Sequence, residues 1–490
     1  MTGYNNADQI TDLRSAVELL GKAPNQLICS EEPVDADAEL AGIYRHVGAG
    51  VPVMPPTRSG PAMLFKRVKG YDDVRVIVGV LANRERIALL LGCKKERLPH
   101  ALLDALKNPI KPVILSGREA ACQEIIHREP IDILKLLPAP TNTECDAGPY
   151  FSMGLIRAED PETGESDVTI HRICVQGPDI MTVAFAPGRH IGHFLRKAEK
   201  LGLNLPVSIN IGLDPAVYLS SCFEPPTTPL GYDELAIAGG IRKRPVELVN
   251  CLTVNAKAIA NSEIVIEGEF QAGERMREDS RTNTGYSMPE FTGYMGVALA
   301  SAPVLKVRAI THRRHPILQT IVGPGEEHGN LSGIPTEASV LRLLEESMPG
   351  RVLNVYAHPA GGGKLLVIIQ FNKRSPMDEG LQRQAAINAL TAFSEVKHVI
   401  LVDKDVDPFD TNDVLWAMTT RYQGDVSSLF IPGVRSHFLD PSQTPEYSRS
   451  IVSKGLTCKT IFDCTVPHHL QDRFKRPLFK EVDWERFLGG

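Results

Sequence analysis

The sequence predicts a multidomain protein that combines α/β and α+β organisation. Its length of 490 residues suits roughly two to four folding units. Strand-like runs dominate between about residues 150 and 325, whereas strands and helices alternate between about 335 and 465. We therefore expect an N-terminal α/β unit, a central barrel or open antiparallel sheet, and a C-terminal α/β unit.

The first unit is predicted to cover residues 1–126. Apolar residues at helical spacing predict an amphipathic helix over residues 8–22, capped by Asp8 or Thr11. Further along, the segment 74–91 combines a β-like apolar run with a helical pattern. A mixture of helix and strand on this scale is typical of an α/β domain.

The second unit, residues 127–325, is predicted to consist mainly of strands. Its centre is a β-hairpin over residues 167–186, because two β-rich runs flank the turn residues Gly-Pro-Asp at 177–179. Between residues 220 and 234 the chain is polar and rich in proline, without periodicity, which predicts a long loop.

The hairpin brings unlike chemical groups together. Arg172 shares a face with apolar residues, and Asp167 lies on the opposite face. A buried guanidinium needs an anion. Arg189 and His190 follow directly after the second strand, and this mixture predicts an anionic ligand beside a hard divalent metal. The alternative is structural: a strand-edge carboxylate, an arginine paired with a distant glutamate, and ordinary loop histidines.

Other positions carry candidate chemistry. Glu234 ends the polar loop, and oxygen and nitrogen donors of Asp, His and Glu suit Mn²⁺ or Mg²⁺. Glu290 lies among apolar and aromatic neighbours in an irregular segment, so it is a candidate general acid with a raised pKa, or else a surface loop residue. His328, Lys364 and His437 are candidate polarising groups, each with a structural alternative.

The third unit, residues 326–465, is predicted to be a layered α/β domain, and residues 466–490 an arm that packs on another surface, such as a second subunit. A helix is expected from Thr336, as its cap, to Met348. The glycines before Lys364 are followed by Leu365 rather than Ser or Thr, so no phosphate loop is present. There is also no dinucleotide fingerprint.

Composition excludes several classes of protein. Apolar residues make up 43% and charged residues 23%, as in ordinary globular proteins, and the net charge of −6 argues against a nucleic-acid partner. No window reaches the roughly 18 apolar residues of a membrane span, and no signal peptide is apparent. Nine cysteines without a Cys-x-x-Cys pair predict neither a disulfide framework nor a zinc site. We expect a cytoplasmic protein that does not bind membranes.

Nine stretches together resemble the UbiD-type decarboxylases that depend on prenylated FMN (prFMN), and most of all the protocatechuate and gallate decarboxylase branch. The resemblance covers nearly the whole chain. It is carried by residues 38–46, 138–143, 167–172, 188–191, 224–235, 288–291, 322–328, 360–364 and 416–421.

The resemblance implies a central flavin-reductase-like split β-barrel that binds prFMN, and an arm that forms homo-oligomers, dimers or hexamers. It implies Mn²⁺ (or Mg²⁺) and K⁺ as further cofactors, and a flavin prenyltransferase as the supplier of the flavin. The implied metal ligands are Asp167, His190 and Glu234. The implied cofactor contacts are Thr169, Ile170, His171, Arg172, Arg189 and His190.

The implied activity is the non-oxidative, reversible decarboxylation of hydroxylated benzoic acids, gallate to pyrogallol or protocatechuate to catechol, with prFMN as electron sink. Arg172 would bind the substrate carboxylate and Glu290 would donate the proton. His328, Lys364 and His437 would contact the phenolic hydroxyls. The alternatives are a UbiD-type enzyme for another aromatic or unsaturated acid, a flavin oxidoreductase, and a non-enzymatic flavin carrier.

Two features need separate comment: an acid that is missing from a family-like stretch, and the spacing of Asp167 and Arg172. Gly285 stands where many relatives have the first of two acids, and Glu278 or Asp279 are the candidate replacements. Asp167 and Arg172 are five residues apart, so they would face opposite ways on a regular strand, and we expect a bulge or twist between them. The sequence does not decide between gallate and protocatechuate, or the direction of the reaction.

Overall fold

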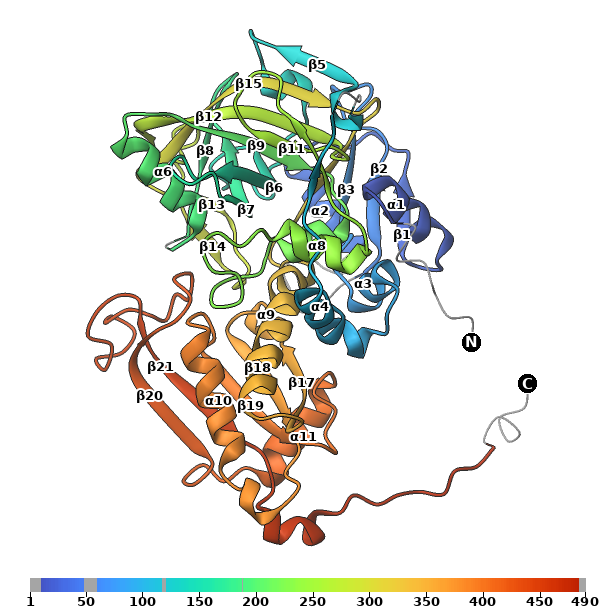
Figure 1. Cartoon of the computed structure of the whole chain (residues 1–490), viewed down its shortest axis with the longest axis vertical. Coiled ribbons are helices and arrows are strands. Elements are labelled where there is room, and N and C mark those ends of the chain that lie inside the picture. Colours follow the sequence, from blue (N-terminus) through green and yellow to red (C-terminus); the bar gives the residue numbers. More distant parts are fainter. Residues whose placement is uncertain (1–9, 48–59, 117–119, 187, 484–490) are drawn as a thin grey trace.

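The computed structural model describes residues 10–47, 60–116, 120–186 and 188–483 (Figure 1). The chain folds into a mixed α/β protein of several domains. The N-terminal part has the elements α1 (Leu13–Lys22), β1 (Leu27–Ser30), α2 (Glu39–Val47), β2 (Ala62–Phe65), β3 (Arg75–Val78), α3 (Arg84–Leu91), α4 (Leu98–Lys107), β4 (Val113–Ile114), β5 (Ile125–Arg128) and α5 (Ile133–Leu136). A four-stranded sheet in the order β1-β2-β3-β16 includes β16 (Ile317–Thr320) from much later in the chain.

The first helix is shorter than predicted. It begins at Leu13, and its cap is Asp12, whose side chain accepts a hydrogen bond from the backbone N–H of Ser15. Thr11 is therefore not the cap, and Asp8 lies outside the described residues. Asp12 and Ser15 form a reciprocal capping pair, which fixes where the helix starts.

The central part contains a closed barrel of six antiparallel strands. These are β6 (Tyr150–Glu159), β7 (Ser166–Val175), β8 (Ile180–Val183), β9 (Leu205–Ile211), β12 (Ile264–Met276) and β15 (Ala302–His312). Their order is β12-β9-β6-β7-β8-β15, and the pairing of β12 with β15 closes the barrel. The predicted hairpin is confirmed as β7 and β8. Large apolar side chains such as Phe151 and Phe270 are buried in its core.

Helices and small sheets surround the barrel. They are α6 (His190–Lys200), α7 (Pro215–Ser220), α8 (Leu235–Arg242), β10 (Glu247–Asn250), β11 (Lys257–Ile259), β13 (Tyr286–Pro289) and β14 (Met295–Val297). The strand-rich prediction missed α6 to α8. Residues 221–234 form the predicted loop, which contains hydrogen-bonded turns but no helix or strand.

The C-terminal part is a layered α/β domain. Its elements are α9 (Glu326–Ser347), β17 (Val352–Ala357), β18 (Leu366–Phe371), α10 (Leu381–Ala392), β19 (His398–Asp403), α11 (Thr411–Arg421), β20 (Ser428–Arg435) and β21 (Leu456–Asp463). The sheet order is β17-β18-β19-β21-β20, with parallel pairing in its centre. After β21 come a 3₁₀ segment (His468–Phe474) and an extended tail in which Leu478 and Phe479 are exposed. Figure 1 shows this tail running away from the domain.

Helix α9 corrects one prediction. Thr336 does not cap a helix, because α9 starts ten residues earlier, at Glu326, and carries Pro335 inside it. Proline removes one helical hydrogen bond. Most of α9 is buried between α4 and β17, and this packing holds the helix through the proline (Figure 1). None of the helices in the described part of the chain has the length and apolar character needed to cross a membrane.

Candidate active site

Three potential metal ligands meet beside the barrel. Asp167 lies on β7, His190 is the first residue of α6, and Glu234 immediately precedes α8. One ligand atom from each lies within 4.8 Å of the others. The Nδ1 atom of His190 is 2.9 Å from Oδ1 of Asp167. Glu234, from the loop that was predicted to suit a hard cation, therefore lies beside Asp167 and His190.

The electrostatics of this cluster fit a bound cation. Glu234 is 2% exposed, and its Oε2 atom is buried without a hydrogen-bond partner among the described residues. Burial, followed by the negative charge of Asp167, raises the pKa of Glu234 well above its ordinary value. Two buried carboxylates side by side repel each other unless a cation lies between them. Two oxygens and one nitrogen suit Mn²⁺ or Mg²⁺.

Arg172 is held between two carboxylates. Its Nε and Nη2 atoms donate to Glu278 at 2.8 and 2.9 Å, and its Nη1 donates to Glu290. Of the two candidate replacements for the acid missing at Gly285, the structure thus selects Glu278, whereas Asp279 pairs with Arg277. The buried guanidinium has its anions, as the sequence required.

Glu290 has the environment expected of a general acid. It is 8% exposed. Burial and the nearby charge of Glu278 raise its pKa above the ordinary value, although Arg172 opposes this shift. A raised pKa keeps a larger fraction of the carboxyl protonated near neutral pH, which is the state that can give up a proton.

The bulge or twist was expected between Asp167 and Arg172, but pairing of β7 with β6 is regular from Ser166 to His171, and the irregularity lies in β6 opposite Arg172. Pairing of β6 with β7 shifts between Phe151 and Gly154, so that two residues of β6 stand opposite Arg172 alone. This is the geometry of a β-bulge. Next to it, four consecutive residues of β7, 169–172, line one cavity.

That cavity has a volume of about 230 Å³, and nearly all the residues predicted to contact the flavin or the substrate line it. Those that line it are Thr169, Ile170, His171, Arg172, Arg189, Glu290, His328, Lys364 and His437. His190 belongs to the metal cluster instead. The Nε2 atom of His171 and the Nδ1 atom of His328 are buried without hydrogen-bond partners among the described residues, so the cavity offers polar atoms to a ligand.

The imidazoles that line the cavity are uncharged at neutral pH. Burial lowers the pKa of His171 to about 3 and that of His328 to about 4. Burial also lowers the pKa of His437. Phe291 lies edge-on to His328 and His437, with ring centroids 5.7 and 4.7 Å apart. A neutral imidazole can both donate and accept a hydrogen bond, as a hydroxyl ligand requires.

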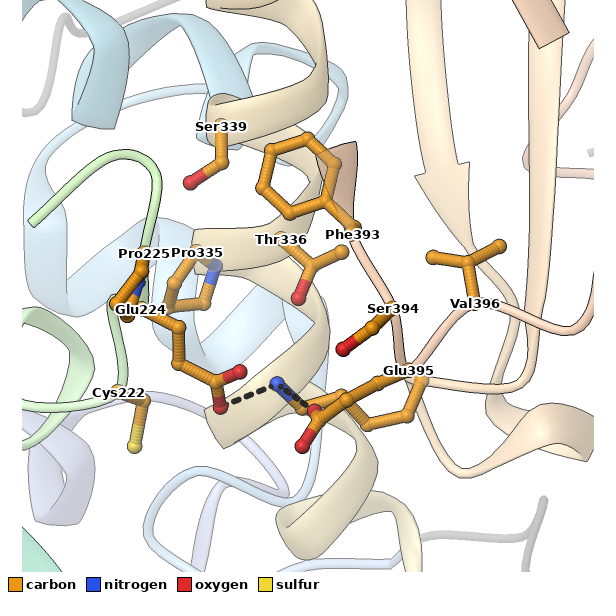
Figure 2. Close-up of a pocket in the computed structure, with 11 residues that line it drawn as sticks. Cys222, Glu224, Pro225, Pro335, Thr336, Ser339, Phe393, Ser394, Glu395 and Val396 are labelled. Atoms are coloured by element: carbon orange, nitrogen blue, oxygen red, sulfur yellow. Dashed lines mark hydrogen bonds and ion pairs between the residues drawn. The ribbon is translucent and has the colours of Figure 1, made fainter. Parts of the chain in front are cut away.

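Lys364 lies between two carboxylates. Its Nζ atom is 2.7 Å from Oε1 of Glu224 and 3.0 Å from Oε2 of Glu395. Figure 2 shows Glu224 and Glu395 reaching the same nitrogen from different segments of the chain. Burial lowers the pKa of Lys364, but the two carboxylates outweigh it and the pKa is raised. Lys364 is therefore a charged donor.

Sequence reasoning missed several of these partners. Glu224 was noted only within a family-like stretch, and Phe291 only as a neighbour of Glu290. Glu395 lies in the connection between α10 and β19 and carries no motif. Its role could be found only from its distance to Lys364, because nothing in the sequence places residue 395 beside residue 364.

These features define an enzyme site: a cavity with a paired arginine and a buried acid, next to a cluster suited to a divalent cation. Family models named for 3-octaprenyl-4-hydroxybenzoate carboxy-lyase match the chain at residues 20–106 (N-terminal domain), 113–326 (Rift-related domain) and 329–464 (C-terminal domain). The chain belongs to the UbiD family of carboxy-lyases.

Individual relatives agree with this assignment. A gallate decarboxylase of Lactiplantibacillus plantarum is 46% identical over 488 residues, covering 98% of this chain and 100% of that protein. The apo structure of a 3,4-dihydroxybenzoic acid decarboxylase from Enterobacter cloacae is 57% identical, with a TM-score of 0.93 and coverage of 98% and 99%. The UbiD-class enzyme HmfF from Pelotomaculum thermopropionicum, in an evolved dimeric form with prFMN, is 33% identical, with a TM-score of 0.81 and coverage of 98% and 99%.

Proposed function

We propose that this protein decarboxylates hydroxylated benzoic acids, gallate to pyrogallol or protocatechuate to catechol, without oxidation and reversibly. The observation that best supports the proposal is the set of residues that line one cavity. Arg172, flanked by Glu278 and Glu290, shares it with Lys364 and two neutral histidines. The names of the gallate and dihydroxybenzoate decarboxylases support it.

Arg172 binds the carboxylate of the substrate, and Glu290 supplies the proton. The net reaction exchanges the carboxylate for a proton on the same ring carbon, so CO₂ leaves and Glu290 protonates that carbon. Glu290 then regains a proton from solvent. When bound, prFMN supplies the electron sink that holds the electron pair left behind by CO₂.

His328, Lys364 and His437 bind the phenolic hydroxyls. Lys364 is charged and donates, whereas the two imidazoles are neutral and accept or donate. Hydrogen bonds that draw the phenol proton away increase electron donation into the ring. A site built to bind hydroxyls also discriminates strongly against acids that lack them, because its buried polar groups would remain unpaired.

The cofactor-binding residues fall into a group for the divalent metal and a group for the flavin. Asp167, His190 and Glu234 would hold Mn²⁺ or Mg²⁺, as the unpaired oxygen of Glu234 supports. Thr169, Ile170, His171, Arg172 and Arg189 would contact prFMN, with His190 reaching it through the metal. A K⁺ site is proposed near Ser221, which lines the cavity, whereas Arg421 lines a separate cavity with Asp403 and Asp405.

We also propose the domain boundaries 1–126, 127–325, 326–465 and 466–490, the last as an oligomerisation arm of a dimer or hexamer. The family models span residues 20–106, 113–326 and 329–464, so they support the boundary at residue 325, whereas the central model begins 14 residues before residue 127. The exposed Leu478 and Phe479 support the arm. The closed barrel supports a flavin-reductase-like cofactor domain.

The test is an anaerobic assay of protein co-expressed with a flavin prenyltransferase and supplied with Mn²⁺ and K⁺. Gallate, protocatechuate and cinnamate are given separately, and CO₂ and product are followed. Pyrogallol or catechol formed only in the prenylated sample is the expected result, with protein carrying plain FMN as control.

Other outcomes would select the alternatives. Turnover of cinnamate alone would reject the hydroxyl-binding roles of Lys364 and the histidines. Bleaching of the flavin by NADH would favour an oxidoreductase. Tight binding of prFMN with no CO₂ from any acid would favour a carrier protein.

A further inference from the structure

Four charged side chains join the barrel to the C-terminal domain beside the cavity. The barrel region contributes Arg189 and Glu224, and the C-terminal domain contributes Lys364 and Glu395. Each cation meets both carboxylates. Arg189 lies 2.6 Å from Glu224 and 3.8 Å from Glu395, and Lys364 lies 2.7 and 3.0 Å from the same two residues.

The four charges sum to zero in a partly buried place, where the side chain of Arg189 is 24% exposed. The side chain of Lys364 is 8% exposed, and those of Glu224 and Glu395 are 20% and 21% exposed. Both cations are therefore already neutralised by the protein. An additional negative charge would be attracted less strongly here than by an unpaired cation, and it would be repelled by both carboxylates.

Glu395 differs from the other three in its position. Arg189, Glu224 and Lys364 line the large cavity, whereas Glu395 lines the small adjoining pocket shown in Figure 2. It approaches Lys364 from there, and its Oε1 atom lies 3.6 Å from Nε2 of His437. Glu395 thus sets the charge around two hydroxyl-binding groups without lining their cavity.

The backbone around Glu395 is fixed. Lys459 donates to the carbonyls of Leu390 and Ser394 at 2.9 and 3.0 Å, which anchors the end of α10. Ser436, next to His437, donates to the carbonyl of Glu395 at 3.2 Å. The backbone that carries Glu395 is therefore held in place by the fold.

We propose that Glu395 is a specificity-determining residue that excludes benzoates carrying a second anionic group where a hydroxyl is bound. With Glu395 present, Lys364 and Arg189 have no net charge left for a second carboxylate, but Lys364 still donates a hydrogen bond to a neutral hydroxyl. Specificity of this kind arises from repulsion of the wrong ligand. The proposal rests on the proposed function for the class of substrate.

The test compares terephthalate, which has a carboxylate where protocatechuate has its para hydroxyl, with protocatechuate itself. Binding of both to the flavin-loaded protein is measured by calorimetry, and terephthalate is also tested as an inhibitor of decarboxylation. In Glu395→Gln, one unit of negative charge is lost near Lys364, so we expect terephthalate to bind about tenfold more tightly. Protocatechuate affinity should change by less than about threefold.

Two controls isolate the position of the charge. Glu395→Asp keeps the carboxylate and should bind terephthalate as the wild type does. Glu346→Gln removes one charge from an exposed residue on α9, which pairs with Arg342, and should change nothing. If Glu395→Gln fails to fold, Glu395→Ser removes the same charge and carries the same expectation.

Unchanged terephthalate binding in Glu395→Gln, or an equal gain in Glu346→Gln, would overturn the proposal. Failure of the proposed function would look different. In that case no variant would release CO₂ from protocatechuate, while calorimetry would still report whether Glu395 controls the binding of a second carboxylate.

Discussion

Glu234 and Glu337 are both buried glutamates, but the charged side chains next to them have opposite signs. Glu337 on α9 is 0% exposed and receives two hydrogen bonds from Arg84, at 2.8 and 2.9 Å, and one from the backbone N–H of Ala357. Glu234 is 2% exposed, yet its Oε2 atom has no partner among the described residues and its charged neighbour is Asp167.

The difference shows what separates a structural acid from a ligand site in this protein. Burial raises the pKa of both carboxyls. At Glu337 the positive charge of Arg84 opposes the shift, whereas at Glu234 the negative charge of Asp167 adds to it. Burial alone therefore does not mark a cation site, whereas a buried acid whose main charged neighbour is another acid does.

The largest expected effect concerns a functional acid, Glu290, whose substitution leaves Arg172 paired with Glu278. Glu290→Gln should lower kcat by about 10²- to 10⁴-fold, the usual contribution of a positioned proton donor. The side chain keeps its size, so thermal unfolding and prFMN absorbance should match the wild type. Steady-state rates on protocatechuate measure the loss, and near-normal turnover would remove Glu290 from the mechanism.

At Glu337 we expect a loss of stability without a loss of activity. Glu337→Ala leaves the guanidinium of Arg84 buried without its anion, which costs about 3–5 kcal/mol of unfolding free energy. Activity per folded molecule should persist. Urea unfolding measures the loss, and the double variant Arg84→Met with Glu337→Leu should recover much of it because no charge remains buried. A single variant as stable as the wild type would show that the pair is dispensable.

A smaller effect of the opposite sign is expected at Glu234. Its folded pKa is raised, so in metal-free protein the contribution of Glu234 to stability is most favourable at low pH and is lost as pH rises past the ordinary glutamate pKa. Glu234→Gln removes this loss and should stabilise metal-free protein at pH 7 by about 1 kcal/mol. Thermal melts in chelator at several pH values test this, and destabilisation by the substitution would contradict it.

The smallest effect is a shift in a pH profile. The charge of Glu278 helps to raise the pKa of Glu290, so Glu278→Gln should lower that pKa. A proton donor is lost as pH rises through its pKa, and the alkaline limb of the kcat profile should therefore move to lower pH. Asp279→Asn, at the neighbouring acid that pairs with Arg277, should leave the limb in place.

Much of the site could be predicted from short stretches of sequence. The hairpin places Asp167 and Arg172 by local spacing alone, and the polar loop identified Glu234. The family-like stretches linked these positions to His328, Lys364 and His437, which lie far apart in the chain and line one cavity in the structure.

What the sequence did not predict depends on long-range packing. Glu395 meets Lys364 only because the sheet brings the start of β19 beside the loop before β18. Helix α9 passes through Pro335 because tertiary contacts outweigh the local preference of proline, and Thr336 lies inside it for that reason. Closure of the barrel likewise depends on the pairing of β12 with β15, which no local pattern specifies.

The most direct test of the account is titration of metal-free protein with Mn²⁺, followed by calorimetry. We expect one site in the wild type, and affinity at least about tenfold weaker in Glu234→Gln, because an anionic carboxylate is replaced by a neutral amide. The double variant Arg84→Met with Glu337→Leu, which also removes a buried glutamate, should bind Mn²⁺ as the wild type does. Equal Mn²⁺ affinity in wild type and Glu234→Gln would contradict the claim that Glu234, Asp167 and His190 form a cation site.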